Sequence, residues 1–557
     1  MTQREYSKLQ VRAEVLAVIQ QLSALDETSR ENQVRQIKRL RTIQNVDYIL
    51  ECLLRELPKG NYDQKQIIAQ LLLEFGSLEK LEKPLWAIIK DPNQPDIIKD
   101  VANVILRNLG DTSDPDLYLS YLKDPHELID KETERMLKVA SLNPEAQIDF
   151  LDFLFSLPPK EQLNLINSLK DDYPGEYLTC IFMPAIEANL QDETIKTLIE
   201  ALGNTKSSRA LAFLEEIYPY ANNDIKKKTL KKSINLLKLS GAKTEDVKDY
   251  YKELLSESKL FKCYVSSIDG IGNQAIIISR IKENGDISLF SVVVNDIQGI
   301  MDCFGFNQIT KTDFDRVVKK FNDGEEREDI SPYYCYYRLK ISQEINRILD
   351  MPLPYEYSAW RALAYDIENF TEDLDELVES LKDESLINNT HILYTCQDFY
   401  CWFFEDEDHP TILEFFENCL AYFIENLEKY SNSPEEFSQY FESEINNSID
   451  KIFDDSWREL YYSRLKNQAY ILNLRNMTNE AVLASTIAWA LKNPNICVKD
   501  ISFIVKLIQK SMVEFFLRFQ YKLDDSVATS KYKIPDNQVS IFKNLLDELF
   551  TIWQVDF

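Results

Sequence analysis

Hydrophobic residues follow two different spacings along the chain, one typical of helices and one typical of strands. In residues 1–255 and 358–557 they recur at helical spacing, as in TILEFFENCLAYFIENL. Between residues 261 and 306 three nearly continuous apolar runs appear instead: FKCYVSS, NQAIIISRI and DISLFSVVVN. We therefore predict a mostly α fold. Its expected parts are an N-terminal α-solenoid at 1–257, a small central α+β module at 258–350 and an acidic, all-α helical domain at 351–557.

The central module is expected to contain a β-hairpin. Asn284 and Gly285 separate two β-branched runs, and this dipeptide favours a type I′ turn, in which both central residues take positive φ. The flanking runs, 275–281 and 289–294, are almost continuously apolar. Such runs predict strands that are buried against helices on one or both faces.

The segments on either side of this hairpin carry weaker signals. Residues 264–267 are expected to form an edge strand beside the hairpin. Residues 296–310 are interpreted as a turn that precedes a helix at 311–321. Thr310 or Thr312 is expected to cap that helix through its side-chain hydroxyl.

Gly270, Gly272 and Ala275 formally match the glycine-rich fingerprint of dinucleotide-binding folds. That fingerprint functions only where a strand precedes it and the N-terminus of a helix follows, because the helix holds the pyrophosphate. Here a strand is expected to follow. We therefore interpret the two glycines as part of a turn between strands, and no cofactor is predicted.

Helix ends in the N-terminal half recur roughly every 35 residues, with one longer gap. The residues at these ends are Gly76, Gly110, Asn143, Gly203 and Gly241. Glycine or asparagine suits a helix C-cap in the left-handed conformation. The segment EALGNTKSSRALAFLEEIYPYANNDIKKKTLKKSINLLKLSG, residues 200–241, resembles a HEAT repeat of the subtype found in phycobilisome-lyase-like proteins.

The resemblance to HEAT repeats extends over the N-terminal half of the chain. It implies a curved stack of helix pairs that holds a partner, since each pair buries its apolar face against its neighbours. Some proteins with this repeat are lyases and a few are DNA glycosylases, but most are scaffolds. No motif in this chain carries a catalytic residue over from them. An irregular helical bundle is the alternative.

The run YVSSIDGIGNQAIIISRIKENGDISLFSVVVNDIQGIMDCFGF resembles a region of uncharacterised bacterial proteins, some of which also carry a small SEC-C zinc-binding motif. The matching positions are Val294, Asp296, Gly299, Ile300, Met301 and Asp302. Asn295 departs from the pattern. The chain has no cysteine or histidine cluster at SEC-C spacing, so the zinc function is not implied. The resemblance indicates an extended strand pair and no chemistry.

Negative charge is concentrated in one part of the chain. The net charge is −29, and residues 351–450 hold 24 acidic against 3 basic side chains. Such a surface repels phosphate backbones and anionic lipids, so neither nucleic acid nor membrane is an expected partner. No apolar run approaches the ~20 residues that span a bilayer, and the charged start MTQREYSKLQ lacks an apolar signal core. Nine scattered cysteines favour reduced thiols and a cytoplasmic location.

Two groups of residues are candidates for binding a protein partner. One is a lysine-rich stretch near residue 230, where a helix would bring most of the lysines to one side. It is either a solvated face or a docking patch for an acidic partner, such as this chain's own acidic region. The other is a tyrosine cluster in the helix that Pro332 opens, which is either an aromatic binding surface or a packing seam. The candidates are Lys227, Lys228, Lys231, Lys232, Tyr333, Tyr336 and Tyr337.

Patterns for catalysis or metal binding are weak. The chain has only three histidines, at 126, 391 and 409, which leaves few candidates for a histidine metal site or triad. The densest acidic cluster, EDEDH at 405–409, lacks the spacing of a calcium loop. We predict no catalytic, cofactor-binding or metal-binding residue and interpret the protein as an interaction scaffold or adaptor. The alternatives are an enzyme with carboxylate-based, lyase-like chemistry, and nucleic-acid binding by the lysine-rich helices.

Overall fold

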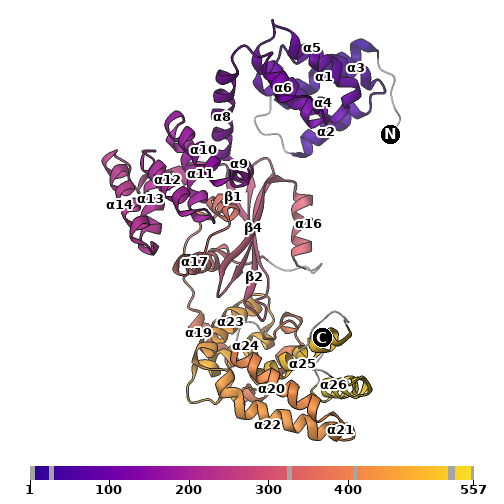
Figure 1. Cartoon of the computed structure of the whole chain (residues 1–557), viewed down its shortest axis with the longest axis vertical. Helices are drawn as coiled ribbons and strands as arrows, with labels where there is room; N and C mark the ends of the chain where they lie inside the picture. The colour runs from indigo at the N-terminus through magenta and orange to yellow at the C-terminus, as the bar shows by residue number, and fades with distance from the viewer. Residues whose placement is uncertain (1–6, 24–29, 323–328, 405–409, 525–533, 554–557) are drawn as a thin grey trace.

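A computed structural model of the chain shows a long series of helices that is interrupted once by a β-sheet (Figure 1). The residues it describes are 7–23, 30–322, 329–404, 410–524 and 534–553. Helices dominate, and a four-stranded antiparallel sheet lies in the middle of the sequence. The predicted fold class, mostly α with a small central α+β module, is confirmed.

The first helices pack around a hydrophobic core of their own. They are α1 (Lys8–Ser23), α2 (Arg30–Arg41), α3 (Val46–Glu56), α4 (Tyr62–Phe75), α5 (Leu78–Lys90), α6 (Asp96–Asn108) and α7 (Pro115–Leu119). Their buried aliphatic side chains form one cluster between Val11 and Tyr118. The long helix α8 (Pro125–Leu142) leads from this core to the next one (Figure 1).

The second group of helices forms two layers beside the sheet. They are α9 (Pro144–Ser156), α10 (Pro159–Asp172), α11 (Gly175–Glu187), α12 (Asp192–Gly203), α13 (Ser208–Ile217), the 3-10 turn η1 (Tyr218–Tyr220), α14 (Asp224–Leu239) and α15 (Asp246–Leu254). In one layer, α12 contacts both α10 and α14. In the other layer, α9 and α11 contact α18 (Tyr355–Trp360), and α9 also contacts the sheet. The central module therefore covers one side of this helical stack.

Two of the five predicted helix ends take the left-handed conformation. Gly110 and Gly241 have φ values of +94° and +93°. The prediction is wrong for the other positions, which lack a positive φ: Gly76, Asn143 and Gly203. At Gly203 the physical reason is a close approach of α12 to α14, because an added Cβ would lie 2.8 Å from the Ser233 side chain.

The sheet consists of β1 (Ser258–Val265), β2 (Asn273–Lys282), β3 (Ile287–Asn295) and β4 (Gly299–Ile309), paired in that order. The predicted hairpin of β2 with β3 and the edge strand β1 are confirmed. The predicted type I′ turn is wrong, because Gly285 alone has positive φ there (+87°). The Lys282 N–H donates to the Asp286 carbonyl. This hydrogen bond closes a three-residue loop in which glycine takes the left-handed position.

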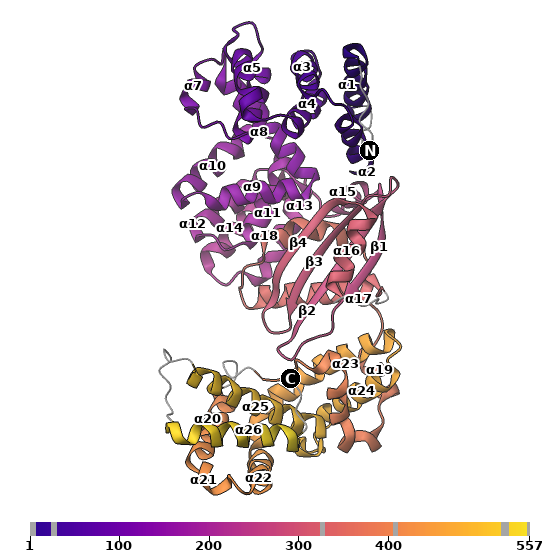
Figure 2. The same ribbon diagram turned by 90° about the vertical axis from the view of Figure 1, so that its right-hand side faces the viewer.

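Strand β4 was expected to be a turn, and the structure corrects that expectation. Helices α17 (Pro332–Ile348) and α18 pack on one face of the sheet, where an added Cβ on Gly305 would lie 2.3 Å from the Trp360 ring. Glycine is therefore required for the indole to lie against the strand. On the other face, α16 (Lys311–Phe321) packs through Phe314 (Figure 2). Thr310 caps α16, as predicted.

The C-terminal helices enclose a large aromatic and aliphatic core. They are α19 (Leu374–Leu381), η3 (Glu384–Thr395), η4 (Gln397–Phe399), α20 (Pro410–Glu425), α21 (Leu427–Tyr430), α22 (Pro434–Ile452), α23 (Asp455–Leu474), α24 (Thr478–Lys492), η5 (Val498–Asp500), α25 (Ser502–Asp524), η6 (Asp536–Gln538) and α26 (Val539–Trp553). In the described part of the chain, no helix is both long and apolar enough to cross a bilayer.

The segment before α19 packs into the core of the sheet through Leu353, Trp360 and Ile367. The domain boundaries at 257 and 350 stay predictions.

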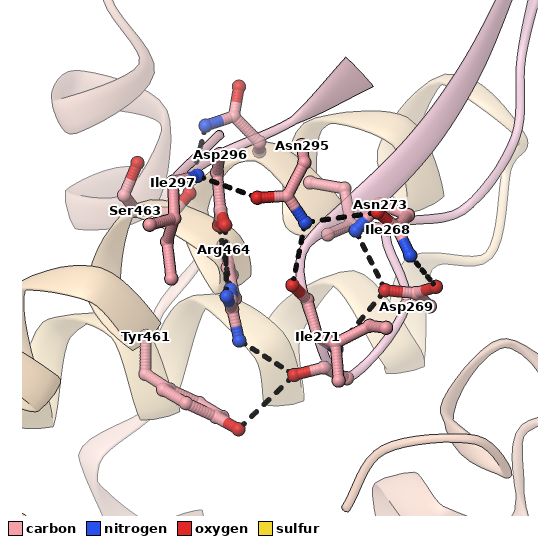
Figure 3. A network of polar contacts seen from close by, with 12 residues as sticks. Ile268, Asp269, Ile271, Asn273, Asn295, Asp296, Ile297, Tyr461, Ser463 and Arg464 are labelled. Carbon is pink, nitrogen blue, oxygen red and sulfur yellow. Dashed lines mark hydrogen bonds and ion pairs between the residues drawn. The ribbon is translucent and has the colours of Figure 1, made fainter. Parts of the chain in front are cut away.

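The C-terminal body is joined to the sheet through the turns at one end of its strands (Figure 3). Arg464 of α23 is buried, and its Nε and Nη2 atoms lie 2.6 and 2.9 Å from the two carboxylate oxygens of Asp296. Its Nη1 donates to the Gly270 carbonyl at 2.6 Å, and the Tyr461 hydroxyl donates to the same oxygen. Gly270 and Gly272 thus lie in a turn between β1 and β2, which confirms that interpretation over a dinucleotide fingerprint.

Candidate protein-binding cleft

A cleft of about 680 Å³ lies between the helical stack and the central module. One wall comes from α11, α13 and α15, and the other from α17, α18 and the segment that follows α18. These elements meet because α18 packs on α11 and α15 packs on α13. The aromatic and charged residues that line the cleft are Arg209, Phe213, Glu216, Tyr220, Tyr251, Tyr336, Tyr337, Lys340, Glu344, Arg347, Tyr357, Arg361, Tyr365 and Phe370.

Tyrosines provide most of the aromatic surface of the cleft. The rings of Tyr251 and Tyr365 stack with centroids 3.8 Å apart, and this pair joins α15 to the segment after α18. Tyr337 packs against Phe370 at 5.3 Å. Burial raises the pKa of the Tyr336 hydroxyl, and the nearby carboxylate of Glu216 raises it further. The hydroxyl therefore stays protonated and available to donate a hydrogen bond at neutral pH.

Two arginines at the base of the cleft share one buried carboxylate. Glu187, at the end of α11, has a side chain that is only 6% exposed. Arg361 Nη2 lies 3.0 Å from its Oε2, and Arg347 Nη2 lies 3.3 Å from its Oε1. The Ser358 hydroxyl donates to Oε2 at 2.8 Å. Because the charges are paired and hydrogen-bonded, this group fixes α17 and α18 against α11.

A second carboxylate reaches the same arginines from the cleft side. Glu216 Oε1 accepts a hydrogen bond from Arg347 Nη1 at 2.8 Å, and the Glu216 side chain is 52% exposed. Burial alone would raise the pKa of Glu216, but the charges of Arg361, Arg347 and Lys340 outweigh burial and lower it. Glu216 is therefore a carboxylate at neutral pH, surrounded by three cations.

Arg209, on α13, lines the wall of the cleft that the helical stack provides. Its guanidinium is stacked on Tyr250 at 3.9 Å from the ring centroid and pairs with Glu176 at 3.0 Å. Arg209 Nη2 also lies 3.2 Å from the sulfur of the buried Cys180. These contacts hold α13 against α11 and α15, so the wall that carries Arg209 is rigidly supported.

The structure separates the tyrosines that the sequence grouped together. Tyr336 and Tyr337 line the cleft, which fits the binding interpretation. Tyr334 is fully buried against Tyr470, which fits the packing interpretation. Tyr333 is 43% exposed and lies outside the cleft. One helix thus presents its tyrosines in three different environments.

The candidate lysines lie on α14 and not in the cleft. Lys227, Lys228, Lys231 and Lys232 are exposed, and no ion pair joins them to any residue that the structure describes. A second hollow, of about 450 Å³, is lined by Ile225 and Lys226 at the start of α14. Tyr220 and Arg347 line both this hollow and the cleft. Figure 1 shows α14 beside the upper part of the sheet and helices α20–α26 below the sheet, so these four lysines are not docked on the acidic helices of this chain.

Sequence reasoning missed the charged residues Glu216, Arg347 and Arg361 of the cleft, and also Glu187, which pairs with both arginines. Only Glu187 carries a local signal, because a lone carboxylate ends the apolar run LTCIFMPAIE. Within the described residues, no cluster of three or more histidine, cysteine or carboxylate side chains is arranged to hold a metal ion. The acidic cluster at 405–409 lies outside the described residues.

Comparisons of the chain with protein-family models, with curated proteins and with solved structures found no match. The resemblances to HEAT repeats and to the SEC-C-associated region therefore stay predictions. The function has to be argued from the cleft itself.

Proposed function

We propose that the protein is an interaction scaffold that holds a segment of a partner protein in the cleft between the helical stack and the central module. The observation that carries this proposal is the composition of the cleft: six tyrosines and three arginines line a hollow of about 680 Å³. Tyrosine and arginine are enriched at the residues that dominate binding energy in protein interfaces. A hollow of this size accommodates a few side chains of a partner.

The cleft gives less support to carboxylate-based catalysis. Of the carboxylates that line it, Glu216 has a lowered pKa and Glu344 lies at the exposed side of α17. A general acid needs a carboxyl pKa raised toward neutrality. Nucleic-acid binding also has less support. The lysines of α14 are the surface best suited to it, but they form a single helix face on a chain of net charge −29, which repels a phosphate backbone. We place the scaffold in the cytoplasm, since the described cysteines are free thiols.

Affinity purification with a matched control tests this proposal. We expect the double variant Tyr336→Ala and Tyr365→Ala to lose a partner that the unaltered protein retains, because loss of two aromatic contacts costs about 2 kcal/mol or more. Tyr333→Ala, on the same helix as Tyr336 but outside the cleft, should retain that partner. Equal recovery with both variants, or no specific partner with any form, would contradict the proposal.

A further inference from the structure

Helix α14 has a basic outer face whose charge is mostly unpaired within the described part of the chain. Residues 224–239 contain six lysines and one aspartate. Lys226 and Lys238 pair with carboxylates of neighbouring elements. The buried side chains of the helix lie on its opposite side. The remaining lysines are exposed and form no ion pair with any described residue: Lys227, Lys228, Lys231 and Lys232.

The surroundings of these lysines favour an acidic protein surface as their partner. Glu200 of α12 lines a small hollow with Lys232, but Lys170 of α10 lines it too, so the excess of positive charge remains. Ile225 and Leu239 of α14 are 70% and 85% exposed. Protein interfaces bury apolar side chains beside charged ones, whereas non-specific binding of nucleic acid rests on phosphate contacts.

Helix α22, in the C-terminal body, has the opposite charge. Residues 434–452 contain five carboxylates and one lysine. The adjoining residues 410–430, of α20 and α21, add four carboxylates and one lysine. Four carboxylates of α22 lie on its exposed side and form no ion pair with a described residue: Glu435, Glu436, Glu442 and Asp450. The two helices are also similar in length, with 16 residues in α14 and 19 in α22.

These two surfaces do not meet within one molecule. Figure 1 shows the sheet between α14 and α22. Two copies of a chain with a net charge of −29 repel each other at long range. However, the Debye length is about 10 Å at 0.1 M salt, so the charges at a contact outweigh those of the distant surface.

We infer that α14 of one molecule docks on α22 of a second copy of the chain. Charge complementarity selects this occupant, because unpaired lysines and unpaired carboxylates then neutralise each other. The contact joins two different surfaces, so molecules add head to tail and each pair keeps one free α14 and one free α22. The inference does not depend on the proposed role of the cleft.

Sedimentation velocity of the full-length protein measures this self-association. We expect the average mass to rise with protein concentration at about 50 mM salt, and the association constant to fall about tenfold or more at about 500 mM salt. The double variant Lys228→Glu and Lys232→Glu should associate at least about tenfold more weakly. The double variant Glu435→Lys and Asp450→Lys should show a similar loss.

Mixing the two double variants provides the sharpest readout. Each variant retains the surface that the other has lost, so the mixture should form pairs although neither variant associates alone. Restored pairing also shows that both variants are folded. Lys248→Glu with Lys252→Glu is the matched control, because it makes the same change of net charge at exposed positions on α15. It should leave the association constant within about twofold of the unaltered value.

Three results would overturn the inference: a protein that stays monomeric at low salt, an equal loss of association in the control, or a mixture that does not pair. If the α14 variant loses an acidic cellular protein while the purified chain stays monomeric, a different partner occupies α14 and the inference falls. The proposed function of the cleft stands in each of these cases, because its tyrosine variants are tested separately.

Discussion

Glu187 is the residue on which the walls of the cleft depend. Its carboxylate accepts from Arg347, Arg361 and Ser358, which lie 160 or more positions further along the chain. The side chain is 6% exposed, so water does not replace these contacts. Two guanidinium groups would lose their shared counterion without it. Removal of one partner from a buried ion pair costs far more than the pair itself contributes.

Substitution of Glu187 by glutamine should therefore destabilise the protein strongly. We expect the free energy of unfolding to fall by roughly 3–5 kcal/mol, because Arg347 and Arg361 become uncompensated charges. Urea denaturation followed by circular dichroism measures this change. Glu215→Gln is the control, since Glu215 pairs with Lys238 at the surface, and it should cost less than about 1 kcal/mol. Equal losses for both variants would contradict the role given to Glu187.

At the scale of elements, local sequence patterns predicted the hairpin and missed the fourth strand. Strands β2 and β3 are buried on both faces, so their apolar runs are continuous and easy to recognise. Strand β4 lies at the edge of the sheet and contains Gly299 and Gly305. Gly305 lies there because Trp360 packs on it. Such a tertiary contact leaves no signal in the local pattern.

The same limit applies to the cleft. Tyr336 and Tyr337 were recognised because four tyrosines gather at the start of one helix. Arg347 and Glu216 are 131 positions apart in the chain, and Arg361 and Glu187 are 174 positions apart. Nothing in a single sequence shows that such residues meet. The sequence therefore predicted two of the six tyrosines that line the cleft and none of its charged residues.

The turns between the strands also determine how the C-terminal body is attached. Arg464 joins α23 to Asp296 and to the Gly270 carbonyl, and both the arginine and the aspartate are largely buried (Figure 3). Arg464 thus bonds to two turns at once. The Ile268 N–H also donates to Gln468, and the Ile268 carbonyl accepts from the Trp402 indole, so further contacts complete the joint. Without Arg464, the Asp296 carboxylate would lose its charged partner, while the Gly270 carbonyl would keep the hydrogen bond from Tyr461.

We expect Arg464→Met to loosen this joint. The variant should lose roughly 3–5 kcal/mol of stability, since Asp296 is left as an unpaired charge. Limited proteolysis should cut the chain faster between the sheet and α23 than in the unaltered protein. Arg316→Met serves as the control, because Arg316 is 75% exposed on α16, and its effect should stay within about 0.5 kcal/mol. Unchanged proteolysis of Arg464→Met would show that the joint does not depend on this arginine.

At the scale of the whole molecule, the helical stack and the acidic body lie on different sides of the sheet (Figure 1). The side of the stack formed by α9 and α11 is covered by α18 and the sheet, not by the acidic helices. The cleft lies where the stack meets the module, and its second wall includes Tyr357, Arg361 and Tyr365 from the first part of the acidic stretch 351–450.

Site-specific photocrosslinking in cells tests the central claim most directly, because it maps contacts at single positions. A benzophenone amino acid replaces Tyr365, which is 38% exposed at the cleft, or Tyr333, which is 43% exposed outside it. We predict that the probe at 365 crosslinks to one discrete protein segment and that the probe at 333 does not. The absence of any protein crosslink at 365, or the same crosslinks at both positions, would contradict the proposal that the cleft holds a partner.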